Sequence, residues 1–284
     1  YKKSVQTKAH IDFVNSYIEN QTENLYNSED VVAAIDKYHI DAIIIGSDAV
    51  VQHHPLLSRI HRGRRKPFYI SHPAPERMFP NPFWGCGFDD KIPTVMMSVS
   101  SQNSKYSQFS KSLKSRMSKT LNNMKYISVR DTWTLNMMKA IGVNHDVKVT
   151  PDPVFAFNYN AGHLVPSEDD IRKRFSLPKD YVLVSLHSQS LTLKTLDELN
   201  SMFKAVGKTC VAFPMPGGVR YQHHFDYEIK VPLSSIDWYA LIKYASGYVG
   251  SNMHPIVVSL HNAVPCFSID HWGTKDFFNR TVRD

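Results

Sequence analysis

The stretch "GYVGSNMHPIVVSLHNAVPCFSID", residues 247–270, indicates how this chain folds. A short apolar run leads into a polar turn, a longer apolar segment follows, and another apolar run ends the stretch. This order predicts a strand over residues 248–250, a helix over 255–262 and a strand over 266–269. A helical crossover between two strands makes them parallel. The polar turn then lies at the carboxyl end of the first strand, where α/β proteins bind ligands.

The same alternation of strands and helices runs along most of the chain. Linker-like residues 158–166 interrupt it, and Ser167 is expected to cap the next helix. This pattern predicts two Rossmann-like, doubly wound α/β domains that face each other across a cleft, at residues 1–158 and 159–284. The first domain lacks an opening strand, so we expect that sequence before Tyr1 is missing. The other expected strands cover residues 41–46, 92–99, 126–129, 147–149, 181–186 and 209–213, and the other expected helices cover residues 1–20, 28–38, 105–121, 131–141, 193–206 and 236–245.

The composition is that of a globular protein that can bury a sizeable core. Hydrophobic residues make up 42% of the 284 residues, and no run reaches the length of a membrane span. The three cysteines, Cys86, Cys210 and Cys266, are far apart and odd in number. They argue against a disulfide framework and against a cysteine-based zinc site, and they fit a reducing, cytosolic setting.

Basic residues are concentrated between Arg59 and Lys66, in a chain whose net charge is +7. One interpretation is a solvated loop. The alternative is an electropositive rim that attracts an anionic substrate, a phospholipid surface or nucleic acid. Charge alone does not choose among these partners.

Several common motifs are missing from the sequence. It contains no G-x-G-x-x-G loop, no Walker A lysine loop and no G-x-S-x-G elbow, which argues against dinucleotide, P-loop and hydrolase chemistry. The adjacent pairs His53-His54 and His223-His224 point apart on regular elements. With no metal-ligand spacing in the sequence, we expect no metal site.

Polar residues follow two expected strands of the first domain. Ser47 and Asp48 come after residues 41–46, where they form either a plain turn or a set of substrate contacts. Arg130 comes after residues 126–129, and Asp131 is a good helix N-cap. Arg130 either pairs with Asp131 or Asp152, or presents its planar fork to a carboxylate or phosphate.

His254 lies in the polar turn of the opening stretch. The structural interpretation is that Ser251 or His254 caps a helix and that Pro255 occupies its first turn, where a missing N–H is harmless. The functional interpretation is general acid–base catalysis, for which imidazole is suited near neutral pH. The residues alone leave both interpretations open.

Four segments, in this order, resemble the polysaccharide pyruvyl transferase family. They are "DAIIIGSDAVV" (41–51), "YISVRDTWTLNMMKAIGV" (126–143) with "VTPDPVFAF" (149–157), "IDWYALIKYASGYVGSNMHPIVVSLHNAVPCFSID" (236–270), and the closing Lys275. The resemblance runs from about residue 13 to residue 275. It implies a two-domain fold similar to the glycosyltransferase-B architecture. It also implies transfer of the enolpyruvyl unit of phosphoenolpyruvate to a sugar of a surface glycan or lipid-linked precursor, with formation of a pyruvate ketal.

The resemblance also assigns roles to residues. His254 matches the late histidine of the family and is the expected general acid, and Arg130 is the expected ligand of the donor anion. Ser47 and Asp48 are expected to bind substrate, with Asp48 on the acceptor hydroxyls. No cofactor or metal is required, since phosphoenolpyruvate is a substrate.

One departure from the family concerns the donor. Asn252 stands where the family turn generally has arginine, so a cation is lost there or comes from Arg220 or Lys275. We count all three as expected substrate-binding residues.

Two alternatives to pyruvyl transfer stay open at this point. One is a glycosyltransferase of the same fold that uses a nucleotide sugar, with His254 and residues 214–220 on its phosphates. The other is a non-catalytic protein that binds anions or nucleic acid through its basic segment. We favour the transferase, without nucleic acid as a partner, in the bacterial cytoplasm, with residues 59–66 toward anionic glycan or the inner face of the membrane.

Overall fold

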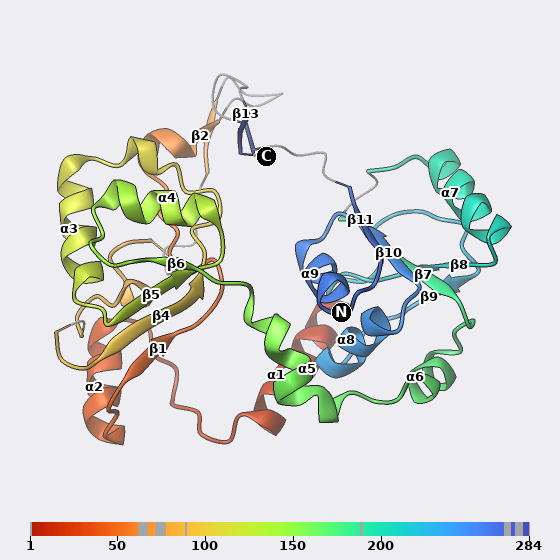
Figure 1. Ribbon diagram of the computed structural model, residues 1–284, viewed down its shortest axis with the longest axis horizontal. Helices are drawn as coiled ribbons and strands as arrows, with labels where there is room; N and C mark the ends of the chain where they lie inside the picture. Colours follow the sequence, from red (N-terminus) through yellow and green to blue (C-terminus); the bar gives the residue numbers. More distant parts are fainter. Residues whose placement is uncertain are drawn as a thin grey trace. The chain divides into compact units, whose positions relative to one another are not determined.

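The computed structural model describes residues 2–61, 68–71, 78–88, 90–187, 190–269, 274–275 and 281–283. It is an α/β protein with two parallel sheets, in the strand orders β1-β4-β5-β6 and β11-β10-β7-β8-β9 (Figure 1). Contacts divide the chain into two compact units. We call residues 22–153 with 272–284 the β4 unit, and residues 1–21 with 154–271 the β7 unit.

The sheet of the β4 unit has four parallel strands. Helices α3 and α4 pack on it through a methionine-rich core that includes Met96, Met117, Met137 and Met138. Two antiparallel pairs, β2 with β3 and β12 with β13, complete the unit. The main elements are α2 (Ser28–Tyr38), β1 (Ile43–Ile45), β2 (Ile60–His61), β3 (Tyr69–Ile70), β4 (Thr94–Val99), α3 (Lys111–Asn122), β5 (Tyr126–Val129), α4 (Thr132–Ile141), β6 (Lys148–Val149), β12 (Thr274–Lys275) and β13 (Thr281–Arg283).

The β7 unit has a five-stranded parallel sheet with a core on each face. Successive strand residues point to opposite faces, so Leu183 packs with α8 and α9 while Val184 packs with α7. The main elements are α1 (Lys2–Tyr17), α5 (Phe157–Ala161), α6 (Glu168–Phe175), β7 (Tyr181–Ser185), α7 (Leu193–Ala205), β8 (Thr209–Ala212), β9 (Tyr227–Glu228), α8 (Ser235–Lys243), β10 (Gly247–Gly250), α9 (Met253–His261) and β11 (Cys266–Ser268).

Local capping sets most helix ends as the sequence predicts. The carboxylate of Asp131 accepts a hydrogen bond from the amide of Thr134 at 2.7 Å, and α4 ends at Gly142 in the left-handed conformation, at φ 92°. Ser167 caps α6, as expected. Asn27 caps α2, and its side chain accepts a hydrogen bond from the amide of Asp30 at 2.8 Å.

Two expected segments differ in the structure. The helix expected over 105–121 begins only at Lys111, because the hydroxyl of Ser110 accepts a hydrogen bond from the amide of Leu113 and fixes the start there. The expected linker, residues 158–166, is mostly helical instead, in α5 and a 3-10 turn over Gly162–Leu164. Apolar residues of this segment pack on the β7 unit's core, which explains why it is ordered.

Helix α1 belongs to the β7 unit although it comes first in the sequence. The buried carboxamide of Gln6 donates to the carbonyl of Leu233 and accepts from its amide, both at 2.8 Å. The side chain thereby satisfies both backbone groups of one residue, as a neighbouring strand would.

The expected domain ranges, 1–158 and 159–284, differ from these units in two respects. Residues 1–21 group with the later unit because of the Gln6 contacts, and the division after α4 and β6 falls before Val154. Within the described ranges, no helix is long and apolar enough to cross a membrane.

Candidate functional site

The carboxyl ends of β7 and β10 lie side by side, because Ser185 and Gly250 are register partners. The turn that follows β10 bonds back to β7 through the amide of Ser251, which donates to the carbonyl of Ser185 at 3.1 Å. The hydroxyl of Ser251 accepts from the amide of His187 at 2.9 Å. Ser251 therefore does not cap the following helix, as one interpretation of the sequence expected.

Helix α9 begins at Met253, with Asn252 in the N-cap position. The Asn252 side chain does not cap the helix and instead donates from Nδ2 to Oγ of Ser185 at 3.1 Å. His254 and Pro255 fall in the first turn, where Pro255 was expected. The His254 side chain is exposed at the amino end of the helix, where the macrodipole favours anions.

His254 lines a cavity of about 610 Å³ within the β7 unit. The polar groups are few and lie at the ends of β7, α8 and α9 and on α1, while four aromatic rings supply much of the wall. No Lys, Arg, Asp or Glu lines the cavity among the described residues. The polar members are Gln6, His10, Ser185, Ser234, Ser235, Asn252 and His254, and the aromatic members are Phe13, Phe157, Trp238 and Tyr239.

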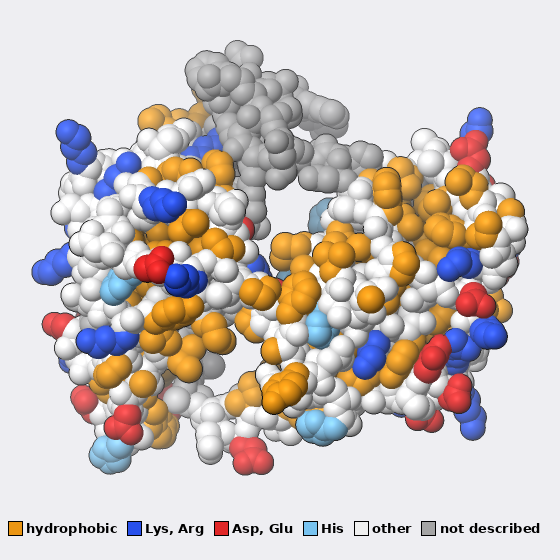
Figure 2. Space-filling model, in the orientation of Figure 1, with side chains coloured by type: hydrophobic (Ala, Val, Ile, Leu, Met, Phe, Trp, Pro, Cys, Tyr) orange, Lys and Arg blue, Asp and Glu red, His pale blue; other side chains and the backbone are white. Residues whose placement is uncertain are grey.

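The surface around α9 is also apolar. Figure 2 shows hydrophobic side chains gathered over α9 on the viewed face of the β7 unit. On α9 itself, Met253 and Leu260 are 49% and 59% exposed. The wall of the cavity beside His254 is therefore largely apolar.

Arg220 and Lys275 were expected to replace the arginine of the family turn. Neither is among the described residues that line this cavity. Arg220 is exposed in the loop after β8, and its guanidinium packs against Gly217, where an added Cβ would lie 2.8 Å from Nη2. The backbone of Lys275 pairs with Thr281 between β12 and β13 and groups with the β4 unit, and its side chain lies outside the described structure.

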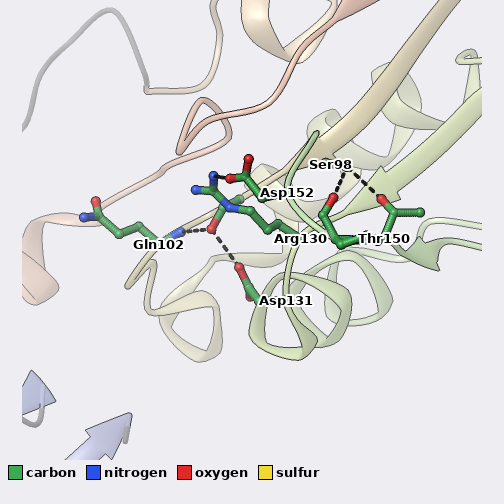
Figure 3. A network of polar contacts seen from close by, with 8 residues as sticks. Ser98, Gln102, Arg130, Asp131, Thr150 and Asp152 are labelled. Carbon is green, nitrogen blue, oxygen red and sulfur yellow. Dashed lines mark hydrogen bonds and ion pairs between the residues drawn. The ribbon is translucent and has the colours of Figure 1, made fainter. Parts of the chain in front are cut away.

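A second polar site lies at the carboxyl edge of the β4 unit's sheet (Figure 3). Arg130 Nη1 lies 2.6 Å from Oδ2 of Asp152, while Asp131 accepts from the hydroxyl of Ser100 at 2.7 Å. The amide of Ser100 donates to the carbonyl of Asp48 at 2.8 Å. The expected residues Ser47, Asp48 and Arg130 thus follow the carboxyl ends of β1 and β5, the two strands that flank β4, at one edge of one sheet.

A buried hydroxyl network supports this edge. Ser98 interrupts β4 with φ 52°, a strained value for a residue other than glycine. Its hydroxyl bonds with that of Thr150 at 2.8 Å and donates to the carbonyl of Pro151 at 2.9 Å. Ser98 therefore fixes the backbone next to Asp152, the partner of Arg130.

Two histidines in the β4 unit lie in an electropositive environment. Burial, together with His54, Arg59 and Arg116, lowers the pKa of His53 from 6.5 to about 4. Burial, Arg59 and Lys105 also lower the pKa of His54. Of the basic segment, Arg59 is described and residues 62–67 lie outside the described structure. Within the described part of the chain, no group of three His, Cys, Asp or Glu side chains could hold a metal ion.

With this geometry in view, comparison with known proteins gives one decisive match. A family model for polysaccharide pyruvyl transferase matches residues 2–273, nearly the whole chain. The chain belongs to the polysaccharide pyruvyl transferase family. The family resemblance of the sequence is therefore confirmed.

Comparisons of this pyruvyl transferase family member with curated proteins and with solved structures add little to its description. No curated protein matches the chain. Among solved structures, one described as "S. aureus MnaA-UDP co-structure" is 12% identical, with a TM-score of 0.42. The match covers 85% of this chain and 64% of that one.

The sequence did not single out Ser185 or Gln6, which line the cavity of this family member. The end of the strand expected over residues 181–186 was a usable signal for Ser185. The contact of Gln6 with Leu233 spans 227 residues and leaves no local pattern.

Proposed function

We propose that this protein transfers the enolpyruvyl unit of phosphoenolpyruvate to a sugar of a surface glycan or lipid-linked precursor and forms a pyruvate ketal. Family membership supports pyruvyl transfer. The donor and the acceptor are part of the proposal. Protonation of the donor's methylene carbon creates an electrophilic C2, a sugar hydroxyl attacks C2, and phosphate leaves. A second hydroxyl closes the ketal.

The position of His254 is the observation that carries this proposal. Its exposed imidazole lines a cavity at the first turn of α9, beside Asn252 and Ser185. A general acid must reach the carbon that it protonates, and a helix N-terminus stabilises an anionic substrate beside that acid. His254 is therefore the proposed acid that protonates the methylene carbon.

Arg130 is the proposed ligand for a donor oxyanion. The hydrogen bond described for its guanidinium uses Nη1 and Asp152, and a guanidinium has five N–H donors in a planar fork. Asp152 would hold this fork in one orientation. Ser47 and Asp48 are proposed to bind acceptor hydroxyls, and Arg220 and Lys275 remain predicted sources of a further cation. The facing of the two units across a cleft, as in the glycosyltransferase-B architecture, stays a prediction.

The test is phosphate release from phosphoenolpyruvate with a panel of galactosides, mannosides and amino sugars. We expect release with at least one acceptor, and a loss of about a hundredfold or more in kcat for His254→Ala. His163→Ala is the matched control, since His163 is an exposed histidine of the same unit that does not line the cavity. The absence of release with every acceptor, or full activity of His254→Ala, would contradict the proposal.

The cavity's size and lining favour a second candidate, a glycosyltransferase that uses a nucleotide sugar. A cavity of about 610 Å³ lies in the range of roughly 300–1,000 Å³ that accommodates drug-sized ligands, and phosphoenolpyruvate is much smaller. Trp238 and Phe13 offer flat apolar surfaces to a base. Thermal stabilisation by a nucleotide sugar alone, without any by phosphoenolpyruvate, would favour this candidate.

The cytoplasmic setting and the role of the basic segment are also proposals. Residues 59–66 carry positive charge that would attract anionic glycan or the inner face of the membrane. Charge reversal of Arg62, Arg64 and Arg65 tests this, with binding to vesicles that contain anionic lipid as the readout. Loss of all function in that variant, together with full function of His254→Ala, would instead indicate a non-catalytic anion-binding protein.

A further inference from the structure

His10 and His254 both line the cavity of the β7 unit, and His10 has a hydrogen-bond partner on its own helix. Nε2 of His10 lies 2.9 Å from Nε2 of Gln6, one turn earlier in α1. Two nitrogens form a hydrogen bond only if one of them donates and the other accepts. The direction of this bond therefore decides which ring nitrogen of His10 carries a proton.

The backbone of Leu233 fixes that direction. Its amide donates to Oε1 of Gln6, and its carbonyl accepts from Nε2 of Gln6, both at 2.8 Å. A backbone amide only donates and a backbone carbonyl only accepts, so the two ends of the carboxamide cannot be exchanged. Nε2 of Gln6 is an NH2 group that gives one hydrogen to Leu233 and directs the other to His10. Nε2 of His10 is therefore the acceptor.

A neutral histidine that accepts at Nε2 carries its ring proton on Nδ1. Such a ring has one donor and one acceptor, and Gln6 already uses the acceptor. The polar ring atom that is left for a ligand is an N–H donor and not a base. Three hydrogen bonds, together with the polarity of one backbone residue, thus determine what His10 offers to the cavity.

The cavity beside His10 is suited to a group that accepts hydrogen bonds without donating any. Its described lining holds no Lys, Arg, Asp or Glu. Helices α8 and α9 begin at Ser235 and Met253, which both line the cavity, and the amino end of a helix favours anions. A carboxylate or phosphate oxygen only accepts, so it matches an N–H that only donates.

We propose that His10 donates from Nδ1 to a carboxylate or phosphate oxygen of the ligand in this cavity, and that Gln6 holds the ring in this tautomer. His10 is a specificity residue that touches the ligand, and Gln6 is a positioning residue that acts through His10. The inference deepens the proposed function, on which it rests, by adding a neutral donor for phosphoenolpyruvate to the cavity of the proposed acid, His254. His10 itself transfers no proton, because Gln6 occupies its lone pair.

The test uses two amide variants of the full chain, each of which keeps one of the two ring contacts. An asparagine amide stands at the position of Nδ1, and a glutamine amide stands at the position of Nε2. His10→Asn thus keeps the donor to the ligand, and His10→Gln keeps the contact with Gln6. By calorimetry with phosphoenolpyruvate, we expect His10→Gln to raise Kd roughly tenfold and His10→Asn to raise it less than about threefold. His163→Gln, at an exposed histidine outside the described lining, should leave Kd unchanged.

The melting temperature without ligand should change in the opposite order. His10→Asn loses a hydrogen bond that His10→Gln keeps, so we expect the lower melting temperature in His10→Asn. A residue with a structural role alone would not lose stability in one variant and affinity in the other. Calorimetry of the same variants with pyruvate and with inorganic phosphate separates the two ligand groups. Weaker binding of pyruvate in His10→Gln assigns the contact to the carboxylate, and weaker binding of phosphate assigns it to the phosphate.

Nitrogen-15 NMR of the imidazole rings determines the tautomer of the free protein. We expect the signals that disappear in His10→Gln to show the proton on Nδ1. A proton on Nε2, equal Kd in His10→Gln and wild type, equal rises of Kd in both His10 variants, or no binding of any probe to wild type would overturn the proposal. The expected changes in Kd without phosphate release from phosphoenolpyruvate would leave this inference standing and contradict only the proposed function.

Discussion

Arg130 Nη1 and Asp152 Oδ2 lie 2.6 Å apart, and their side chains are only 16% and 18% exposed. Most surface ion pairs contribute little, but this pair is shielded from solvent, and Ser98 fixes the backbone next to Asp152 through the carbonyl of Pro151. The pairing and a role in anion binding are compatible, because the acid uses only part of the guanidinium fork.

Replacement of Asp152 by asparagine should reduce both stability and donor affinity. Asp152→Asn removes the charge that orients Arg130, so we expect the free energy of unfolding to fall by about 1.5–3 kcal/mol, the range for hydrogen bonds to charged groups. The KM for the donor should rise more than kcat falls. Denaturant unfolding and initial-rate kinetics measure the two effects.

The exposed pair of Lys204 and Asp226, at 2.9 Å, is the matched control. Its side chains are 50% and 60% exposed, so Asp226→Asn should change the free energy of unfolding by less than about 1 kcal/mol. Equal losses in the two variants would show that the Arg130 pair is an ordinary surface pair.

Replacement of Asn252 by arginine should strengthen donor binding. Asn252→Arg places a guanidinium at the amino end of α9, beside His254, and a charge-assisted bond of about 1.5–3 kcal/mol corresponds to roughly tenfold or more in affinity. The measurement is Kd for phosphoenolpyruvate at low and high salt. Leu260→Arg, an exposed residue of the last turn of the same helix, adds the same charge at the far end and should leave Kd unchanged.

The carboxamide of Gln6 should stabilise the β7 unit, and a carboxylate at the same position should not replace it. Gln6→Glu keeps the size and still accepts from the amide of Leu233, but an ionised carboxylate cannot donate to its carbonyl. We expect both Gln6→Glu and Gln6→Met to lower the free energy of unfolding, by about 1–3 kcal/mol for each backbone group left unpaired. Gln21→Glu, an exposed change that follows the same helix, should have little effect.

Acid should destabilise the β4 unit through His53. Its pKa is about 4 in the folded state and 6.5 ordinarily, so the unfolded chain binds more protons between these values. Stability is therefore full above pH 6.5 and falls as the pH drops toward 4. His53→Leu should flatten the fall of the melting temperature over this window, while the exposed control His163→Leu should not. An unchanged slope in His53→Leu would contradict the assignment.

The sequence predicted the features that depend on residues close together in the chain, namely the strands and the helix caps. Apolar runs between helices predicted strands close to their observed limits, such as residues 126–129, which match β5. Capping side chains predicted the ends of α4 and α6. The same local logic placed Ser47, Asp48 and Arg130 at one sheet edge and His254 at another, because parallel strands bring their carboxyl ends together.

What the sequence did not predict depends on contacts between distant residues. Asn252 and Ser251 look alike as potential caps, and only the packing of β7 against β10 makes one donate to Ser185 and the other accept from His187. The cavity likewise needs α1, which joins the β7 unit through a contact with no local signal. The close approach of Gly250 to the hydroxyl of Tyr248 and to the carbonyl of Ser185 likewise appears only in three dimensions.

The contact between Gln6 and Leu233 also affects how the chain is made. Helix α1 leaves the ribosome 227 residues before its partner, and at about 5–20 residues per second this interval lasts roughly ten to fifty seconds. During that time residues 22–153 emerge and can begin to fold, while the amide of Gln6 stays in water or meets other partners. The β7 unit is therefore completed only after a long delay, because α1 is held in place by Leu233, which is synthesised 227 residues after Gln6.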